Sequence, residues 1–175
     1  MNIAKERKVI LYIAMSLDGF IARTNGAIDW LDDAVEKGDG DNGYTAFYGT
    51  IDTVIIGRKT YDQVLTLADD FPYRDKECFV FSNTVQTDTS YVEFVNEDVG
   101  TFVEALKERE GGDIWLVGGA GLVDSFLKAG LIDEMIITVI PVLLGEGIPL
   151  FKEQANLQLI HSVRYGEFMQ LYYRL

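Results

Sequence analysis

The stretch at residues 114–122 has the residue types and spacing of an anion-binding turn. Four apolar residues at 114–117 run into Gly118 and Gly119, and apolar residues at helical spacing follow from Leu122 onward. This order predicts a buried strand, a turn without side chains and a helix N-terminus, which directs backbone N–H groups and the positive end of the helix dipole at a ligand. Glycine allows phosphates to approach the backbone where a β-carbon would hold them away. The stretch therefore suits a dinucleotide pyrophosphate. Because Gly118-x-x-Gly121 is not the full G-x-G-x-x-G fingerprint, a tight turn without a ligand is the alternative.

Two further polar segments follow predicted strands. Residues 57–61 form another strand–glycine–helix junction, with two cations and a hydroxyl group in the first helical turn. Cations oppose the dipole at a helix N-terminus, so their presence indicates an anion between them and the backbone amides. Arg58, with Ser82 and Thr84 after the next strand, has the chemistry to hold the 2′-phosphate of NADPH. The alternative for each segment is a helix cap or a turn. The predicted cofactor residues here are Gly57, Arg58, Lys59, Thr60, Ser82, Asn83 and Thr84.

The composition excludes several classes of function. The net charge of −13 over 175 residues argues against nucleic acid as a partner, since binding it requires clustered Lys and Arg. One cysteine, Cys78, and one histidine, His161, leave no metal cluster and no Ser-His-Asp triad. Cys78 lies in an apolar run and is expected to be a buried strand thiol. No apolar run is long enough to span a membrane, and the N-terminus lacks a secretory signal, so a cytoplasmic location is expected.

The elements that position these segments alternate between strands and helices. The predicted strands are 9–15, 52–57, 77–81, 91–95, 113–117 and 134–140, several of them apolar enough to be buried on both faces, as in a parallel sheet. The intervals 57–77, 96–112 and 118–133 are long enough for crossover helices. Residues 157–164 and 168–175 read as a hairpin around a three-residue turn. We therefore predict one α/β domain over residues 1–175, a three-layer, doubly wound, mostly parallel sheet with an antiparallel C-terminal hairpin.

The order of these segments resembles the dihydrofolate-reductase-like fold. More specifically, it is similar to the reductase domain of the bifunctional riboflavin-biosynthesis deaminase-reductase and its stand-alone relatives. The matching segments are 16–22, 57–61, 117–122 and 141–151, so the resemblance spans residue 9 to the C-terminus. The most specific of them is the last, which carries a proline, a glycine-rich turn and Leu150-Phe151 after a strand.

The resemblance implies NADPH as the hydride donor. It implies that Arg58, Lys59 and Thr60 approach the adenosine phosphates with Ser82 nearby, and that Ala14 and Ile21 border the nicotinamide. It also implies a pyrophosphate site on Val117, Gly118, Gly119, Ala120, Gly121 and Leu122.

The substrate side departs from the family pattern. Dihydrofolate reductases place a carboxylate on the first helix, and here residues 29–33 offer three, of which Asp29 is our candidate for the proton donor. Aromatic residues beside it would suit a flat heterocycle by stacking. Asp18 is also readable as a turn residue, and Glu146 belongs to the late glycine loop. The predicted substrate residues are Ser16, Asp18, Trp30, Phe47, Tyr48 and Glu146.

These observations predict an NADPH-dependent reductase of a small heterocyclic substrate, pterin- or pyrimidine-like, or of a carbonyl or imine substrate. Dihydrofolate reduction is one alternative, and a non-catalytic nucleotide-binding protein that retains the fold is another, because no carboxylate aligns securely. A homodimer is a further expectation, with residues 136–144 as a buried strand or a subunit interface.

Overall fold

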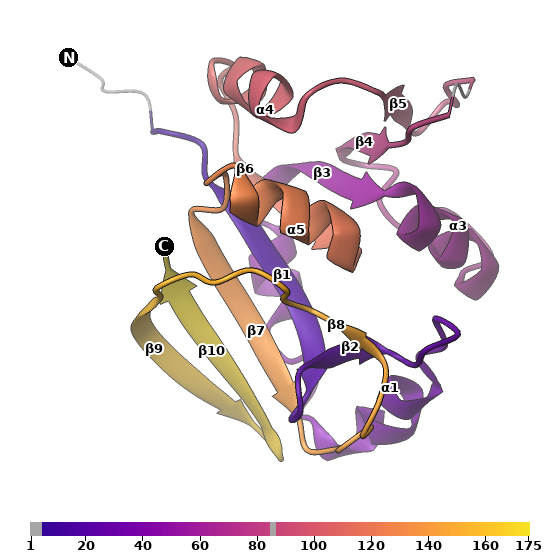
Figure 1. Cartoon of the computed structure of the whole chain (residues 1–175), viewed down its shortest axis with the longest axis vertical. Helices are drawn as coiled ribbons and strands as arrows, with labels where there is room; N and C mark the ends of the chain where they lie inside the picture. Colours follow the sequence, from indigo (N-terminus) through magenta and orange to yellow (C-terminus); the bar gives the residue numbers. More distant parts are fainter. Residues whose placement is uncertain (1–4, 85–86) are drawn as a thin grey trace.

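The computed structural model describes residues 5–84 and 87–175. The main sheet has eight strands in the order β5-β4-β3-β6-β1-β7-β10-β9, and β2 and β8 form a separate pair (Figure 1). The strands are β1 (Val9–Ser16), β2 (Phe20–Ala22), β3 (Ile51–Gly57), β4 (Glu77–Phe81), β5 (Glu93–Val95), β6 (Asp113–Gly118), β7 (Glu134–Ile140), β8 (Ile148–Pro149), β9 (Gln158–Tyr165) and β10 (Phe168–Arg174). The helices are α1 (Asp29–Ala34), α2 (Tyr44–Tyr48), α3 (Arg58–Leu67), α4 (Val99–Lys107) and α5 (Ala120–Lys128), with a 3-10 turn at Val35–Lys37.

The predicted mixture of parallel and antiparallel strands is confirmed. β1 pairs in parallel with β6 and β7, and β3 pairs in parallel with β4 and β6. β10 is antiparallel to both β7 and β9, so the C-terminal hairpin closes one side of the sheet. Each predicted strand is present and begins within two residues of its expected start. Short apolar runs bounded by polar residues predict buried strands well, because such runs are buried when they form part of the sheet.

Alternation along the strands produces the three layers. In β1, Val9 and Leu11 pack in one core cluster with side chains of α4 and α5. Ile10 packs on the opposite face, in a cluster that includes Phe47 of α2 and Tyr61 of α3. Figure 1 shows α5 in front of the sheet. Burial on both faces explains why the central strands are apolar at nearly every position.

The β7 strand lies in the interior of the sheet, between β1 and β10. Ile136 and Ile137 are 7% and 3% exposed, on opposite faces of the strand. Residues 136–140 are therefore part of a buried strand, which was the first of the two alternatives that the sequence offered for residues 136–144. Cys78 is 4% exposed, and burial raises the pKa of its thiol to about 12, as expected for a structural thiol. None of the helices in residues 5–84 and 87–175 has the length and hydrophobicity needed to cross a bilayer.

Candidate functional site

The two strand–glycine–helix junctions lie side by side. β3 and β6 are neighbours, and Ile56 is in register with Gly118. A β-carbon on Gly57 would lie 3.2 Å from the backbone nitrogen of Gly119, so the two turns approach too closely for larger residues. Gly118 has a φ of +128° and is joined to Gly119 by a cis peptide bond; that φ is favourable only for glycine. The glycines of both segments are therefore needed to bring two helix starts to one place.

Neither helix start is capped by a side chain. The N-cap residues are Gly57 for α3 and Gly119 for α5, and neither helix has a side-chain cap hydrogen bond. In α4, by contrast, the Asp98 carboxylate accepts the backbone N–H of Thr101 at 3.0 Å. Two nine- or ten-residue helices thus direct uncapped N–H groups and positive dipole ends toward the same region.

These helix starts border a cleft of about 1380 Å³. It lies at the carboxyl ends of β1, β3 and β6. The chain places β3, β4 and β5 on one side of β1, then inserts β6 between β3 and β1 and continues with β7 on the other side, so the direction of strand addition reverses here. Open α/β sheets bind ligands at such a reversal. Figure 1 shows α3 and α5 on one side of this region and β2, β8 and α1 on the other.

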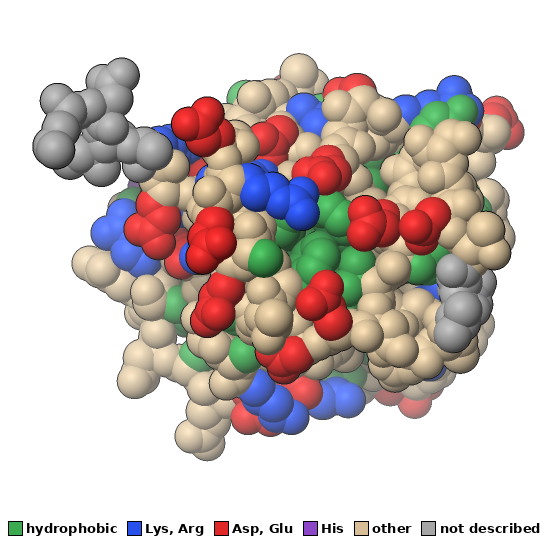
Figure 2. Space-filling model, turned by 90° about the horizontal axis from the view of Figure 1, so that it is seen from above, with side chains coloured by type: hydrophobic (Ala, Val, Ile, Leu, Met, Phe, Trp, Pro, Cys, Tyr) green, Lys and Arg blue, Asp and Glu red, His purple; other side chains and the backbone are tan. Residues whose placement is uncertain are grey.

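The charge of the cleft differs from that of the protein. Asp and Glu side chains are spread over the face seen in Figure 2, in keeping with the net charge of −13. Among the described residues that line the cleft, Arg58, Lys59 and Lys152 outnumber Asp62 and Glu97, which gives a net charge of +1. An acidic protein with a weakly cationic cleft over two helix N-termini is suited to an anionic ligand.

The cleft brings together nearly all of the predicted cofactor residues. Those that line it are Ala14, Ile21, Gly57, Arg58, Lys59, Thr60, Ser82, Asn83, Val117, Gly118, Gly119, Ala120, Gly121 and Leu122. Thr84 is not among them; its hydroxyl lies 3.1 Å from that of Ser82. The Arg58 guanidinium lies 5.6 Å from the Phe94 ring centroid and donates from Nε to Asp62 at 2.8 Å.

Asp29 does not line the cleft. Its carboxylate accepts two hydrogen bonds from Arg23, at 2.6 and 2.8 Å, and its side chain is 55% exposed. The hydrogen bond from Arg23 lowers the pKa of Asp29 below its ordinary value. A carboxylate held ionised at the surface is poorly placed to donate a proton to a substrate in the cleft.

The predicted aromatic substrate residues also lie elsewhere. Phe47 is buried, with its ring 4.1 Å from that of Tyr12 and nearly parallel to it. Tyr48 donates its hydroxyl to Asp75 at 2.6 Å. Trp30 is 3% exposed in the core under α1, and its indole nitrogen has no partner among the described residues. None of the three lines the cleft: Phe47 and Tyr48 of α2 pack in the core cluster on one face of the sheet, and Trp30 of α1 packs in a separate cluster with Ile140 and Phe168.

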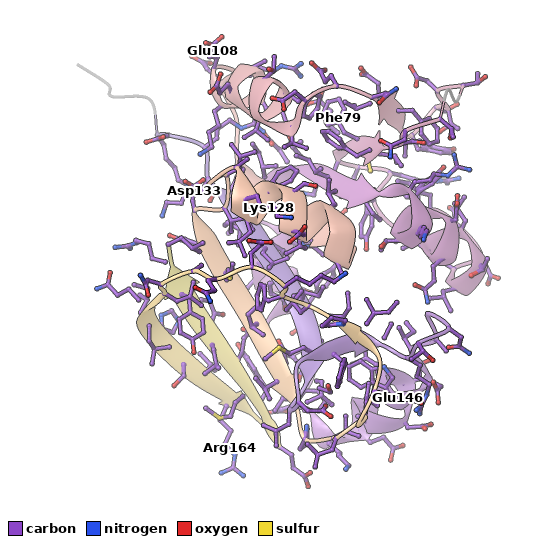
Figure 3. All side chains as sticks on the ribbon, in the orientation of Figure 1. Phe79, Glu108, Lys128, Asp133, Glu146 and Arg164 are labelled. Carbon is purple, nitrogen blue, oxygen red and sulfur yellow. The ribbon has the colours of Figure 1, made fainter. Side chains whose placement is uncertain are left out.

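Ser16, Asp18 and Glu146 belong to the loops beside the cleft. The Ser16 hydroxyl donates to Asp18 at 2.6 Å, and Asp18 accepts the backbone N–H groups of Leu144 and Gly145 at 3.1 and 2.8 Å. Asp18 thus joins the β1–β2 turn to the loop before β8. Glu146 lies on that loop, away from α3 and α5 (Figure 3), and lines a small separate hollow with Arg23.

Sequence reasoning missed the wall formed by residues 24–28 and the outer side of α3. Gln63 joins them, because its side-chain amide donates to the Gly26 carbonyl at 2.9 Å. Val64, Thr66 and Leu67 also line the cleft. The spacing of residues 59, 63, 66 and 67 places them on one helical face, which was the available signal. Within the part of the chain that the structure describes, no three His, Cys, Asp or Glu side chains are grouped as a metal site would require.

Comparison with known proteins agrees with this architecture. The sequence pattern of the RibD C-terminal domain matches residues 7–171. Protein YwjB of Bacillus subtilis (strain 168), whose name states no activity, is 51% identical over 172 residues, which cover 96% of this chain and 98% of that protein. A dihydrofolate reductase of Ureaplasma parvum is 27% identical over 120 residues, covering 69% of this chain and 71% of that enzyme.

Solved structures extend the similarity. A Shewanella sp. PV-4 protein named for riboflavin biosynthesis superposes with a TM-score of 0.85 at 35% identity, and the match covers 95% of this chain and 98% of that one. Acinetobacter baumannii RibD superposes with a TM-score of 0.72 at 19% identity, which shows a shared fold; the match covers 97% of this chain and 58% of RibD.

Proposed function

Because the chain belongs to the RibD C-terminal domain family, we propose that it is an NADPH-dependent reductase of a small heterocyclic, carbonyl or imine substrate. The observation that carries the proposal is the pair of uncapped helix N-termini at a cationic cleft in an acidic protein. The volume of about 1380 Å³ exceeds that of an ordinary single-ligand pocket and leaves room for a dinucleotide and a substrate together.

The residues present fit this cofactor. The backbone N–H groups at the starts of α3 and α5 would hold the phosphates, where the glycines leave space for close approach. Arg58, with Ser82 and Asn83, would hold the 2′-phosphate; its guanidinium would then exchange Asp62 for a doubly charged partner. Ala14 and Ile21 would lie along the nicotinamide end of the cleft.

When bound, NADPH supplies a hydride to an electrophilic carbon, so that a C=O or C=N bond plus one proton from water becomes CH–OH or CH–NH and NADP⁺ is released. The protein's own contribution is binding, orientation and the exclusion of water. Ile13, Ala14 and Leu31 line the cleft with apolar surface for this purpose. The two carboxylates that line it, Asp62 and Glu97, lie on the β5 side, so water remains the proton source.

Cofactor preference tests the proposal. NADPH is expected to bind at least tenfold more tightly than NADH, about 1.4 kcal/mol, by calorimetric titration. Arg58→Gln should reduce this preference to about threefold or less, because one charge-assisted contact to the 2′-phosphate is lost. Arg74→Gln is the matched control, since Arg74 also pairs with an aspartate four residues away and does not line the cleft. Equal affinities for both nucleotides in the unchanged protein would contradict the 2′-phosphate assignment.

Dihydrofolate reduction is the second candidate, favoured by the similarity to the Ureaplasma enzyme. The absence of a carboxylate on the α1 side of the cleft, among the residues described, argues against a pterin held and protonated by the protein. NADPH oxidation on addition of dihydrofolate would establish this candidate. If NADPH binds and a screen of pterins, pyrimidines and imines yields no turnover, the non-catalytic nucleotide-binding alternative takes its place.

A further inference from the structure

Two lysines that line the cleft lack an acidic partner. Ten of the fifteen Lys and Arg side chains form an ion pair with a carboxylate among the described residues. Lys59 and Lys152 line the cleft and are not among these ten. Arg58, the third cation of the cleft, pairs with Asp62. Lys59 and Lys152 are therefore the positive charges of the cleft that no described side chain neutralises.

The acidic residues nearest to these lysines in the sequence are already engaged. Both carboxylate oxygens of Asp62 accept from Arg58 Nε, at 2.8 and 3.0 Å. Glu153, which follows Lys152, pairs with Lys128 at 3.2 Å. In a chain with a net charge of −13, two ammonium groups without a counter-charge at one cleft are available to an anionic ligand.

The backbone on each side of Lys152 is held in place. Leu150 is 1% exposed, and its N–H donates to the Gly19 carbonyl at 3.0 Å. Glu153 is tied by its ion pair to Lys128, in the last turn of α5. Lys152 itself is exposed. Its side chain therefore extends from a fixed position and has its charged end in solvent at the cleft.

Lys59 and Lys152 belong to opposite walls of the cleft. Lys59 lies in the first turn of α3, whereas Lys152 follows β8. Figure 1 shows β8, with β2 and α1, across from α3 and α5. Arg58 lies toward β5, where its guanidinium contacts the Phe94 ring. A phosphate group at the starts of α3 and α5 would thus meet Lys59 from the helix side and Lys152 from the facing wall.

We propose that Lys152 binds the pyrophosphate of the cofactor from the wall that faces α3 and α5. The inference rests on the proposed function, because it assumes a dinucleotide with its pyrophosphate at the two helix starts. Both phosphates of a pyrophosphate are anionic, so Lys59 and Lys152 can match them one for one without breaking an ion pair. Arg58 is left for the 2′-phosphate. Lys152 thus adds a cofactor contact outside the two glycine junctions.

A comparison of two nucleotides tests the proposal, because NADPH and NADH share the pyrophosphate and differ in the 2′-phosphate. Lys152→Gln is expected to weaken the binding of both by about tenfold in calorimetric titration, since one charge-assisted contact is lost. The ratio of the two affinities should stay within about twofold of its value in the unchanged protein. Arg58→Gln, in contrast, should change that ratio.

Two further variants separate a specific contact from the loss of a charge. Lys152→Arg keeps the charge and should bind both nucleotides within about threefold of the unchanged protein. Lys37→Gln removes the same charge from an exposed lysine that has no ion pair among the described residues and does not line the cleft. It should leave both affinities unchanged. The melting temperature of each variant should equal that of the unchanged protein, because both lysines are exposed.

Three results would overturn the proposal. If Lys152→Gln binds both nucleotides as tightly as the unchanged protein, the lysine does not contact the cofactor. If only NADPH binds more weakly, the lysine contacts the 2′-phosphate. If Lys37→Gln has the same effect, net charge is the cause. Failure of the unchanged protein to bind either nucleotide would instead refute the proposed function, before any variant is compared.

Discussion

At Gly121, the effect of a substitution on folding can be distinguished from its effect on ligand binding. This glycine lies in the first turn of α5 and lines the cleft, and a β-carbon there would meet no atom within 4 Å. Gly121→Ala is therefore expected to keep or raise the melting temperature, since alanine stabilises a helix by about 0.5–1 kcal/mol relative to glycine. The same methyl group should weaken NADPH binding by about tenfold by crowding its phosphates. Unchanged affinity in calorimetry would show that the phosphates lie elsewhere.

Asp18 provides a pH test at the residue scale. Its hydrogen bond from Ser16 and those from Gly145 and Leu144 lower its pKa below the ordinary value of 3.8. A carboxyl group whose pKa is lower in the folded state stabilises the fold above pH 3.8 and loses that effect as the pH falls through the folded-state pKa. Asp18→Asn should thus lower the melting temperature at pH 7, and the difference from the unchanged protein should shrink below pH 3.8. Asp33→Asn, on the exposed side of α1, is the control. If Asp18→Asn lowers the melting temperature by the same amount at pH 7 and below pH 3.8, the assignment is contradicted.

At the scale of elements, Arg7, which precedes β1, connects that strand with β3, with α4 and with the residue before β6. It is 3% exposed and donates to the carbonyls of Leu106 and Gly112, to Thr53 and to the Asp52 carboxylate. Arg7→Ala leaves these acceptors without a donor and should lower the free energy of unfolding by about 2–4 kcal/mol in urea titration. Lys5→Ala is the control: Lys5 is 68% exposed in its pair with Asp113 and should contribute about 1 kcal/mol or less.

At the scale of the whole molecule, β9 is one of the two edge strands of the main sheet, the other being β5 (Figure 1). Leu159 and Ile160 are 54% and 43% exposed, and residues 157–175 contain one acidic residue, Glu167, of the 28 in the chain. Two copies can approach there without the repulsion that the acidic surface imposes elsewhere, and an unpaired edge strand can pair with its own copy. We therefore propose β9 as the interface of the expected homodimer, in place of the buried residues 136–140.

Light scattering after size exclusion tests this arrangement. The unchanged chain of 19.6 kDa should elute with about twice that mass at micromolar concentration. Ile160→Lys should give the monomer mass, because it places a charge on the pairing edge. Leu65→Lys, at a similarly exposed position on α3, should remain dimeric. A monomer in all three proteins would exclude the interface.

The sequence alone determined the strands, the crossover helices and the two glycine junctions. Buried strands of a parallel sheet must be apolar on both faces, so 134–140 and 113–117 were readable as continuous runs. The two junctions could be predicted because each combines its glycines and neighbouring polar residues within a few positions of the sequence. The pairing of β3 with β6 then brings the two junctions together. Fourteen of the fifteen predicted cofactor residues line one cleft for this reason.

The tertiary structure alone decided what lies on the substrate side. The short strands β2 and β8 pair Phe20 with Pro149, and Asp18 reaches Gly145, across more than a hundred residues that no local pattern spans. Asp29 was predicted from its place on the first helix, yet its carboxylate pairs with Arg23 at the surface and does not line the cleft. The sequence pattern predicts that α3 has two different sides, but only the packing of the helix determines which side faces residues 24–28 across the cleft.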